Sequence, residues 1–248
     1  MITFSFKPKK IILHTFLPES CSYIATNFPV TYATKYYPEW WKKLPTPEFD
    51  FNNMVIKPNM KSCIGFTELY QNSAVLPLWS DLAIKWDLQK ELWSYQFADK
   101  NTSGDSHGRL QRDGFKMDHF NFKINSPWKF FSDKDVYFNI SQLYYNFPQK
   151  TYFDILPGVV EYYYQNRTNI NIFLRPDINQ IIIPHNTPLF LIRPLSERKL
   201  EIKMEVLNEN DYHKLDSKKR PFSFMKAYIN TKNNIKNQEK KCPFGFIK

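Results

Sequence analysis

The second half of the chain is a series of short apolar runs, and this pattern constrains the fold more than any other feature of the sequence. Each run is rich in Val, Ile, Tyr and Phe, and Pro, Asn, Asp or Gly separates the runs at intervals of roughly ten residues. The runs are FNFKINSPWKFF, KDVYFNISQLYY, ILPGVVEYYYQ, NINIFL, QIIIP, TPLFLIRPL and LEIKMEVL. Short strands at this spacing, with no helical segments between them, are typical of an all-β sandwich or barrel.

Three regions are expected. Residues 75–208 should form a mainly β domain, a sandwich or a distorted barrel of the jelly-roll or β-clip-like kind. Residues 1–74 should form an irregular wrap with one short helix, because three prolines interrupt Tyr36–Phe51 and helical spacing of apolar residues returns only in Lys61–Ser73. Residues 209–248 should form a basic helical tail.

Two segments near the start of the β domain have clear local patterns. Trp93, Tyr95 and Phe97 alternate with other residues at the period of a half-buried strand, and with Leu82–Asp87 they predict a hairpin. The stretch Lys100–Gly114 holds three of the six glycines of the chain and reads as a loop. We therefore expect the strands of the domain to begin before this loop and to resume after it.

Composition excludes several classes of protein. Neither a Rossmann nor a P-loop glycine motif occurs, which argues against the common nucleotide-binding folds. The three cysteines form no C-x-x-C pair, so neither a zinc ribbon nor a disulfide framework is expected. No apolar stretch approaches the ~20 residues of a membrane span, and we expect no membrane partner. A cytoplasmic location in a host cell, or a place in a virion, fits these features.

The formal net charge of +10 is concentrated at one end of the chain. Residues 214–248 hold ten basic and two acidic residues, a net charge of +8, and the other 213 residues carry only +2. The tail can contact nucleic acid or another acidic partner, or it can be a solvated helix docked on the β domain. The residues proposed for such a contact are Lys218, Lys219, Arg220, Lys240 and Lys241.

Histidine residues suggest one metal site. Imidazole is the commonest metal ligand, and His107, His119 and His185, with a carboxylate from Asp105 or Asp118, would supply the two-histidine, one-carboxylate set of iron(II) oxygenases. Under this hypothesis the cofactor is iron(II). The sequence lacks the H-x-[DE] spacing of that class, so scattered core or surface histidines remain the competing interpretation.

Five further residues are candidates for binding a ligand. Trp40 and Trp41 form a tandem pair that either stacks on a ligand or covers an edge of the core. Tyr163 belongs to a run of three tyrosines that we expect on a strand, with one face in the core and the other at a pocket or interface. Arg193, on the strand after His185, would pair with the carboxylate of a 2-oxo acid in the oxygenase hypothesis. Glu161 is a candidate through a resemblance described below.

Residues of about 115–198 resemble a family of phage and bacterial proteins of uncharacterised function. The family runs as Asn-Pro-Trp, a strand, a G-[IV]-V-[DE] turn and P-x-x-T-P-[LI]-x-x-[LI]-x-P. Here Pro127-Trp128, Gly158–Glu161 and Pro184–Pro194 match these elements. The resemblance, extended by the helix near Lys61–Ser73, covers most of residues 61–200 and implies no established activity.

A second resemblance is to the last strands of dUTPase-like folds. The sequence PGVVE followed by two strands is similar to the motif in which an Asp activates the hydrolytic water, and Glu161 stands at the position of that Asp. The phosphate-binding Arg-Ser-Gly motif and the glycine-rich C-terminal motif of the family are absent. The resemblance implies a shared β topology and, at most, nucleotide or nucleic-acid binding without hydrolysis.

Three functional hypotheses follow from these observations. The first is an uncharacterised phage-type auxiliary or virion-associated protein that binds a protein partner or small ligand through an aromatic-rich β surface. The second is an oxygenase of the non-haem iron and 2-oxo-acid type on a jelly roll. The third is a nucleotide- or nucleic-acid-binding domain with the dUTPase-like topology. The sequence leaves open whether the protein is an enzyme.

Overall fold

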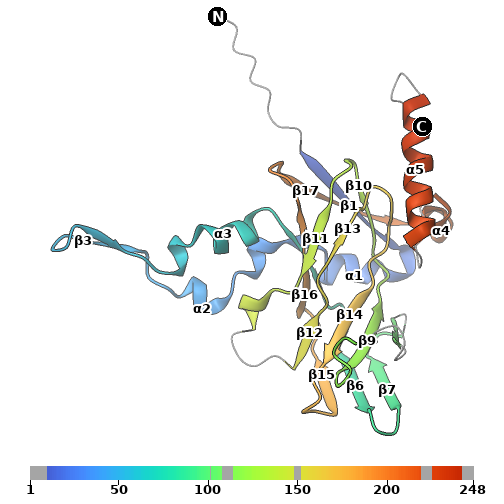
Figure 1. The fold of residues 1–248 in the computed structure, drawn as a ribbon, viewed down its shortest axis with the longest axis horizontal. Coiled ribbons are helices and arrows are strands. Elements are labelled where there is room, and N and C mark those ends of the chain that lie inside the picture. The colour runs from blue at the N-terminus through green and yellow to red at the C-terminus, as the bar shows by residue number, and fades with distance from the viewer. Residues whose placement is uncertain (1–9, 101, 108–113, 148–151, 219–224, 242–248) are drawn as a thin grey trace, which may run out of the picture.

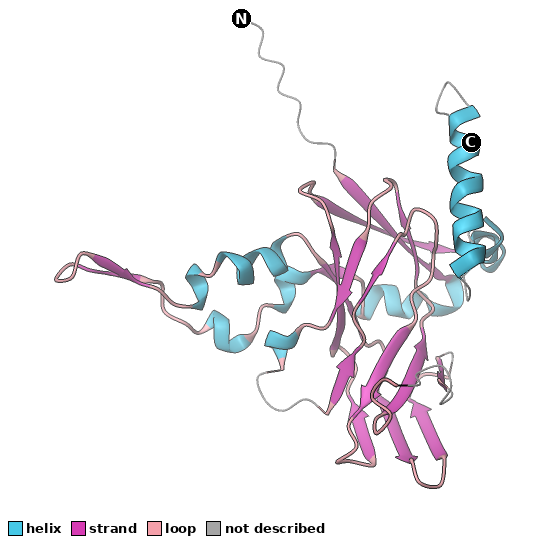
Figure 2. Ribbon diagram, viewed as in Figure 1, coloured by secondary structure: helices cyan, strands magenta, loops and turns pink. Residues whose placement is uncertain are grey.

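The structure is a computed structural model, and it describes residues 10–100, 102–107, 114–147, 152–218 and 225–241. Strands account for 39% of the chain and helices for 23%, so the predicted mainly β fold is confirmed (Figure 2). The described strands form several open, mostly antiparallel sheets and no closed barrel. Of the two forms expected from the sequence, the sandwich is therefore the one adopted.

Seventeen strands are described along the chain. They are β1 (Ile11–Pro18), β2 (Thr31–Tyr32), β3 (Glu48–Asp50), β4 (Val55–Lys57), β5 (Ala74–Pro77), β6 (Leu82–Asp87), β7 (Leu92–Phe97), β8 (Ser103–Ser106), β9 (Phe120–Asn125), β10 (Lys129–Ser132), β11 (Phe138–Ser141), β12 (Phe153–Ile155), β13 (Gly158–Val160), β14 (Ile170–Leu174), β15 (Gln180–Ile183), β16 (Pro188–Pro194) and β17 (Leu200–Leu207).

The described helices are short except at the C-terminal end. The α-helices are α1 (Ser22–Asn27), α2 (Glu39–Lys42), α3 (Ile64–Gln71), α4 (Glu209–Lys218) and α5 (Met225–Lys241). Single 3-10 turns are η1 (Glu19–Cys21), η2 (Ala33–Tyr36), η3 (Met60–Ser62) and η5 (Tyr144–Asn146). The helix predicted within Lys61–Ser73 is α3. Ser62, which lies before it, forms a capping box with Asn59 around η3.

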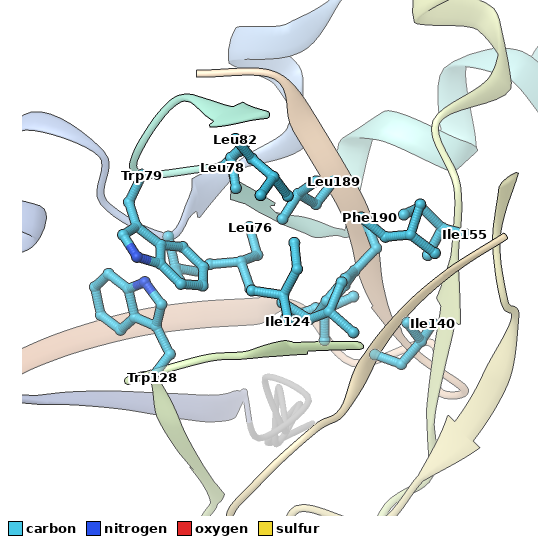
Figure 3. Packing of buried hydrophobic residues seen from close by; sticks show 14 of the residues in the cluster. Leu76, Leu78, Trp79, Leu82, Ile124, Trp128, Ile140, Ile155, Leu189 and Phe190 are labelled. Carbon is cyan, nitrogen blue, oxygen red and sulfur yellow. The ribbon is translucent and has the colours of Figure 1, made fainter. Parts of the chain in front are cut away.

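The strands form five sheets, and four of them enclose one hydrophobic core. Their strand orders are β10-β1-β17, β13-β11-β16-β5-β2, β12-β14-β9-β8 and β15-β6-β7, while β3 and β4 pair only with each other. Figure 3 shows part of the core, where side chains from several strands meet, among them Leu76, Ile124, Ile140 and Phe190. Alternate residues of these strands point inward, as the period-2 pattern requires.

The first strand lies inside the β domain and not in a wrap. β1 runs antiparallel to β10 and parallel to β17, and Ile11, Leu13 and Leu17 are fully buried. The prediction of an irregular N-terminal region is therefore wrong for Ile11–Pro18. The strand was missed because His14 and Thr15 interrupt an otherwise apolar run that does not alternate between apolar and polar residues, although Ile12 and Phe16 share the outer face with His14.

The β13-β11-β16-β5-β2 sheet is covered on both faces. Phe190 and Ile192 of β16 face the main core, whereas Leu191 and Val75 face a second cluster made by Phe66 and Tyr70 of α3. The remainder of the second cluster comes from η2 and the residue after it, α2, η3, a further residue of α3, and the segment before η5. The set is Ala33, Tyr36, Tyr37, Trp40, Trp41, Met60, Leu69 and Leu143. The predicted wrap does exist here, on the outer face of this sheet.

The segment QIIIPHNTPLFLIRPL carries the chain from one sheet to another. β15 pairs with β6, and β16 pairs with β11 and β5, so the two strands do not form a hairpin with each other. The Thr187 hydroxyl donates to the carbonyl oxygen of Pro184 at 2.7 Å and fixes the corner locally, as the turn chemistry predicts. By contrast, β6 and β7 do form the predicted hairpin.

The glycine-rich loop and the tyrosine run differ from the predictions. Within the described part of Lys100–Gly114, Ser103–Ser106 is strand β8, which extends a sheet by pairing with β9. The tyrosines at 162–164 lie in a turn after β13 and not on a strand. Tyr162 and Tyr164 are nonetheless buried and Tyr163 is half-buried, because the turn is itself covered by neighbouring elements.

The two C-terminal helices attach to the β domain in different ways. Tyr212 of α4 is buried; its ring lies against the fully buried Lys129 of β10, with the ammonium nitrogen 3.4 Å from the ring centroid. Lys129 Nζ also donates to the carbonyl oxygen of Tyr212 at 2.6 Å. Helix α5 lies along the outside of the molecule (Figure 1). None of the described helices is long and apolar enough to cross a membrane.

Candidate functional site

The three histidines of the proposed metal site take part in three separate contacts. His107 Nε2 lies 2.8 Å from Asn171 Oδ1, and His119 Nδ1 lies 2.7 Å from Asp118 Oδ1. His185 Nδ1 lies 2.7 Å from Asp81 Oδ1, in the corner before β16. Within the described ranges, no three His, Cys, Asp or Glu side chains are grouped to hold a metal ion. The predicted ligand set is therefore not assembled: His107 and His119 flank the paired strands β8 and β9, whereas His185 lies in the corner between β15 and β16.

The tandem tryptophans complete the second hydrophobic cluster. Trp41 stacks on Tyr37 with ring centroids 4.3 Å apart, and Trp40 packs edge-on against Phe66. Both indole nitrogens donate to backbone carbonyls, that of Trp40 to Tyr145 at 2.9 Å and that of Trp41 to Met60 at 3.2 Å. Of the two alternatives, ligand platform and cover of a core edge, this geometry favours the cover.

Glu161 is the predicted site residue with the most unusual surroundings. Its side chain is only 3% exposed, and its Oε1 atom lies 2.5 Å from the ammonium nitrogen of Lys232 in α5. Lys232 Nζ also lies 3.3 Å from the hydroxyl of Tyr137 and over the rings of Tyr137 and Tyr164, at 5.2 and 5.3 Å from their centroids. Burial lowers the pKa of Lys232, but hydrogen bonds to Glu161 and Tyr137 more than offset this, and the net pKa is raised.

A second lysine of α5 extends this arrangement. Lys236 Nζ lies 3.4 Å from Asp135 Oδ2 and 5.7 Å from the ring centroid of Tyr164. The hydroxyl of Tyr164 donates to the same Asp135 oxygen at 2.8 Å, so the carboxylate and the ring are held together. We call the group Asp135, Tyr137, Glu161 and Tyr164 the ammonium site. Sequence reasoning selected Glu161 but not its lysine partner, which lies 71 positions later.

The other predicted ligand-binding residues stand apart from one another. Tyr163 is half-buried and stacks on Phe131, with centroids 6.2 Å apart. Arg193 is half-buried on β16 opposite Asn139 of β11. A shallow cavity of about 360 Å³ lies across β15, β6 and β7, and none of the five predicted ligand-binding residues lines it. Its lining is Lys85, Trp86, Asp87, Leu92, Trp93, Ser94, Asn179 and Gln180.

The proposed nucleic-acid contacts of the tail fall largely outside the described residues. Lys219 and Arg220 lie outside the described ranges. Lys218, Lys240 and Lys241 lie within helices, but their side chains are not described. The lysines of α5 whose contacts are described, Lys232 and Lys236, are directed at carboxylates of the β domain.

A feature that sequence reasoning missed is the β3–β4 hairpin, which projects from the body of the molecule (Figure 1). Its apolar side chains are exposed: Phe49 by 41%, Phe51 by 81%, Met54 by 72% and Val55 by 50%. Phe49 and Phe51 lie edge to face with ring centroids 5.0 Å apart. The available signal was the Asn52-Asn53 pair between the alternating Phe49 and Phe51 and the apolar run Met54–Ile56, because turn-forming residues between two short apolar runs indicate a hairpin.

The base of this hairpin is firmly attached. The side chain of Asn59 donates to the carbonyl oxygen of Pro45 at 2.9 Å and joins the two ends of the hairpin segment. Just beyond the hairpin, the indole nitrogen of Trp41 donates to the carbonyl oxygen of Met60, and the ammonium nitrogen of Lys61 lies over the Trp41 ring. The hairpin is thus anchored to the second hydrophobic cluster at one end and exposes an apolar tip at the other.

Comparison of the chain with protein-family models, with curated proteins and with solved structures finds no match.

Proposed function

We propose that this protein is a non-enzymatic, auxiliary or virion-associated protein of the phage type, and that it works by binding a protein partner through the β3–β4 hairpin. One observation carries the proposal: the projecting hairpin exposes four large apolar side chains. The rings of Phe49 and Phe51 pack edge to face, Met54 lies in the turn, and Val55 lies on the face opposite to Phe49. Large apolar groups exposed on a projecting element are a mark of interaction surfaces, and aromatic residues and methionine are enriched at the centres of interfaces. The phage-type assignment rests on the resemblance described above.

The hairpin has features of a binding element and not of a folding element. A two-stranded sheet standing alone is only marginally stable in water, and no further strand of the described residues extends this hairpin on either side. The described apolar side chains of the hairpin do not belong to either hydrophobic cluster. A partner that covers the tip and adds a strand to the hairpin would bury these side chains and widen the sheet.

We take a second copy of this chain as the partner. Two open edges allow identical hairpins to pair with each other, as in β-strand addition. The hairpin carries Glu48 on β3 opposite Lys57 on β4, so charges of both signs are present and two copies do not simply repel each other. The surface at the tip is small, and interfaces of this class give weak association, with a Kd of about 1–100 µM.

The other two functions lack a comparable arrangement. The oxygenase hypothesis requires His107, His119 and His185 to converge, and each has a different neighbour. The nucleotide hypothesis requires Glu161 to act on a ligand, but its carboxylate already binds Lys232. The hairpin, in contrast, exposes apolar side chains that a partner can cover.

Sedimentation of the purified full chain tests this proposal. We expect a weight-average mass that rises with concentration between about 1 and 200 µM, in line with the association constant above. The double variant Phe51→Ser/Met54→Ser should stay monomeric over that range. Ile182→Ser serves as the control, because Ile182 is 74% exposed but lies on the body of the β domain. A wild-type chain that sediments as the double variant does would refute the proposal.

A further inference from the structure

The ammonium site surrounds the end of one lysine side chain on several sides. Glu161 supplies a carboxylate oxygen and Tyr137 a hydroxyl group to Lys232 Nζ, at 2.5 and 3.3 Å. The rings of Tyr137 and Tyr164 lie within 5.3 Å of the same nitrogen. Carboxylate and aromatic groups gathered around one cation are the arrangement by which proteins recognise ammonium groups.

The buried carboxylate of Glu161 requires a positively charged partner, whichever molecule provides it. Glu161 is 3% exposed, and its second oxygen, Oε2, has no hydrogen-bond partner among the described residues. A buried carboxylate without a counter-charge is strongly destabilising, because it has lost its hydration and gained nothing in return. The Lys232 ammonium group compensates for that loss on one oxygen only.

Helix α5 is bound to the β domain through its charges more than through an apolar face. Lys232 and Lys236 are one helical turn apart and therefore point to the same side. No residue of α5 whose burial is described is fully buried, and Ile229 is 46% exposed. Helix α4, in contrast, buries Tyr212 against Lys129. Among the described residues of α5, Tyr228 and Ile235 are only half-buried, and the two ammonium groups make the ion pairs to the β domain, so the helix is a replaceable occupant of the site.

We propose that Asp135, Tyr137, Glu161 and Tyr164 form a receptor site for the lysine ammonium groups of a basic helix, and that α5 of the same chain is its internal ligand. The site then has two states. In one state Lys232 and Lys236 of the same chain fill it, and in the other state it can bind the α5 sequence of a separate molecule. Binding in the second state requires that the internal lysines be removed, since an internal ligand has a high effective concentration. This inference does not depend on the β3–β4 hairpin.

A peptide competition experiment with the full chain tests the proposal. The variant Lys232→Gln/Lys236→Gln removes both internal ammonium groups and leaves Glu161 without its counter-charge, so its cooperative unfolding is compared with that of the wild type before peptide is added. A fluorescent peptide with the sequence of residues 225–241 is titrated into this variant and into the wild type, and anisotropy reports binding. We expect binding to the variant and at least tenfold weaker binding to the wild type, whose site is already filled.

Two altered peptides separate recognition from general charge attraction. One carries Gln at positions 232 and 236, and the other carries Gln at positions 240 and 241, so both have the same net charge. The first should bind the variant chain at least tenfold more weakly than the unaltered peptide, and the second should bind within about threefold of it. Equal weakening of the two, or no binding of the unaltered peptide to a variant that unfolds as cooperatively as the wild type, would overturn the proposal.

Discussion

The carboxylate of Asp81 accepts two hydrogen bonds from His185, one from the backbone nitrogen and one from Nδ1, each at 2.7 Å. Asp81 lies directly before β6, and His185 lies in the corner between β15 and β16. The pair therefore joins two corners that are 104 residues apart. Both side chains remain about half exposed, and the contact closes the corner without forming a buried catalytic dyad.

The Asp81–His185 contact predicts a pH dependence of stability. Hydrogen bonds from the His185 backbone and ring lower the pKa of Asp81 below its ordinary value of about 4. A lowered folded-state pKa contributes stability that is present above the unfolded-state pKa and is lost as the pH falls through the folded-state value. We expect Asp81→Asn to be less stable than the wild type at pH 7, with the difference shrinking as the pH falls below about 4.

Urea unfolding between pH 7 and pH 2.5 measures this effect. The variant Glu197→Gln, which removes an exposed carboxylate from the loop before β17, controls for the loss of one negative charge. A constant difference between Asp81→Asn and the wild type across the whole range would contradict the assignment.

Gly104 on β8 should not tolerate a side chain. A Cβ atom at this position would lie 2.1 Å from the Cζ atom of Phe122, and Phe122 is fully buried and cannot swing away. Gly104→Ala should therefore lower the free energy of unfolding by about 1–3 kcal/mol through overpacking. Gly65→Ala in α3 is the matched control, since no atom lies within 4 Å of its Cβ position and alanine is the better helix residue. Equal stability of the two variants in denaturant unfolding would show this packing to be wrong.

The tandem tryptophans should contribute to the stability of the folded protein. Trp41→Ala removes a ring that stacks on Tyr37 and Phe66, and its loss should lower the free energy of unfolding by about 2–4 kcal/mol. Phe51→Ala also removes an aromatic ring, but one that is 81% exposed at the hairpin tip, and should change stability by less than about 0.5 kcal/mol. Chemical denaturation of the two variants would contradict the account if their order were reversed.

Replacement of Tyr212 should lower the free energy of unfolding more than replacement of Lys129. Tyr212→Ala removes the ring beside a fully buried ammonium group and should cost about 3–5 kcal/mol. Lys129→Met removes the buried charge together with its need for partners and keeps the volume, so it should cost less than about 2 kcal/mol. Thermal unfolding of both variants provides the comparison, and a larger loss for Lys129→Met would count against the cation–ring contact.

Much of the β architecture could be predicted because strand patterns are local. The runs that became β14, β16 and β17 were recognisable from composition and spacing alone, as was the β6–β7 hairpin. Strand partners were not recognisable, because pairing depends on contacts between distant segments. Thus β15 and β16 look like one hairpin in the sequence, yet they lie in different sheets.

The candidate sites were harder to predict for the same reason. Glu161 was selected through a resemblance, whereas its surroundings depend on Lys232, which no local pattern connects to it. The histidines were grouped because their chemistry is similar; His107 and His119 do flank one strand pair, β8 and β9, but His185 lies in another sheet corner and each histidine has its own partner. Phe49 and Phe51 were present in the sequence as an alternating pair, but whether such a pair is buried or exposed is decided by what packs beside it.

Photo-crosslinking of the purified full chain shows directly whether the hairpin tip is the surface through which two copies bind. Benzoylphenylalanine replaces Phe51 in one preparation and Ile182 in another, and both are irradiated at about 50 µM, within the expected range of association. We expect a covalent dimer from position 51, with the crosslink mapped to the hairpin of the second copy, and little or none from position 182. Equal yields from the two positions, or a chain that stays monomeric after irradiation at position 51, would contradict it.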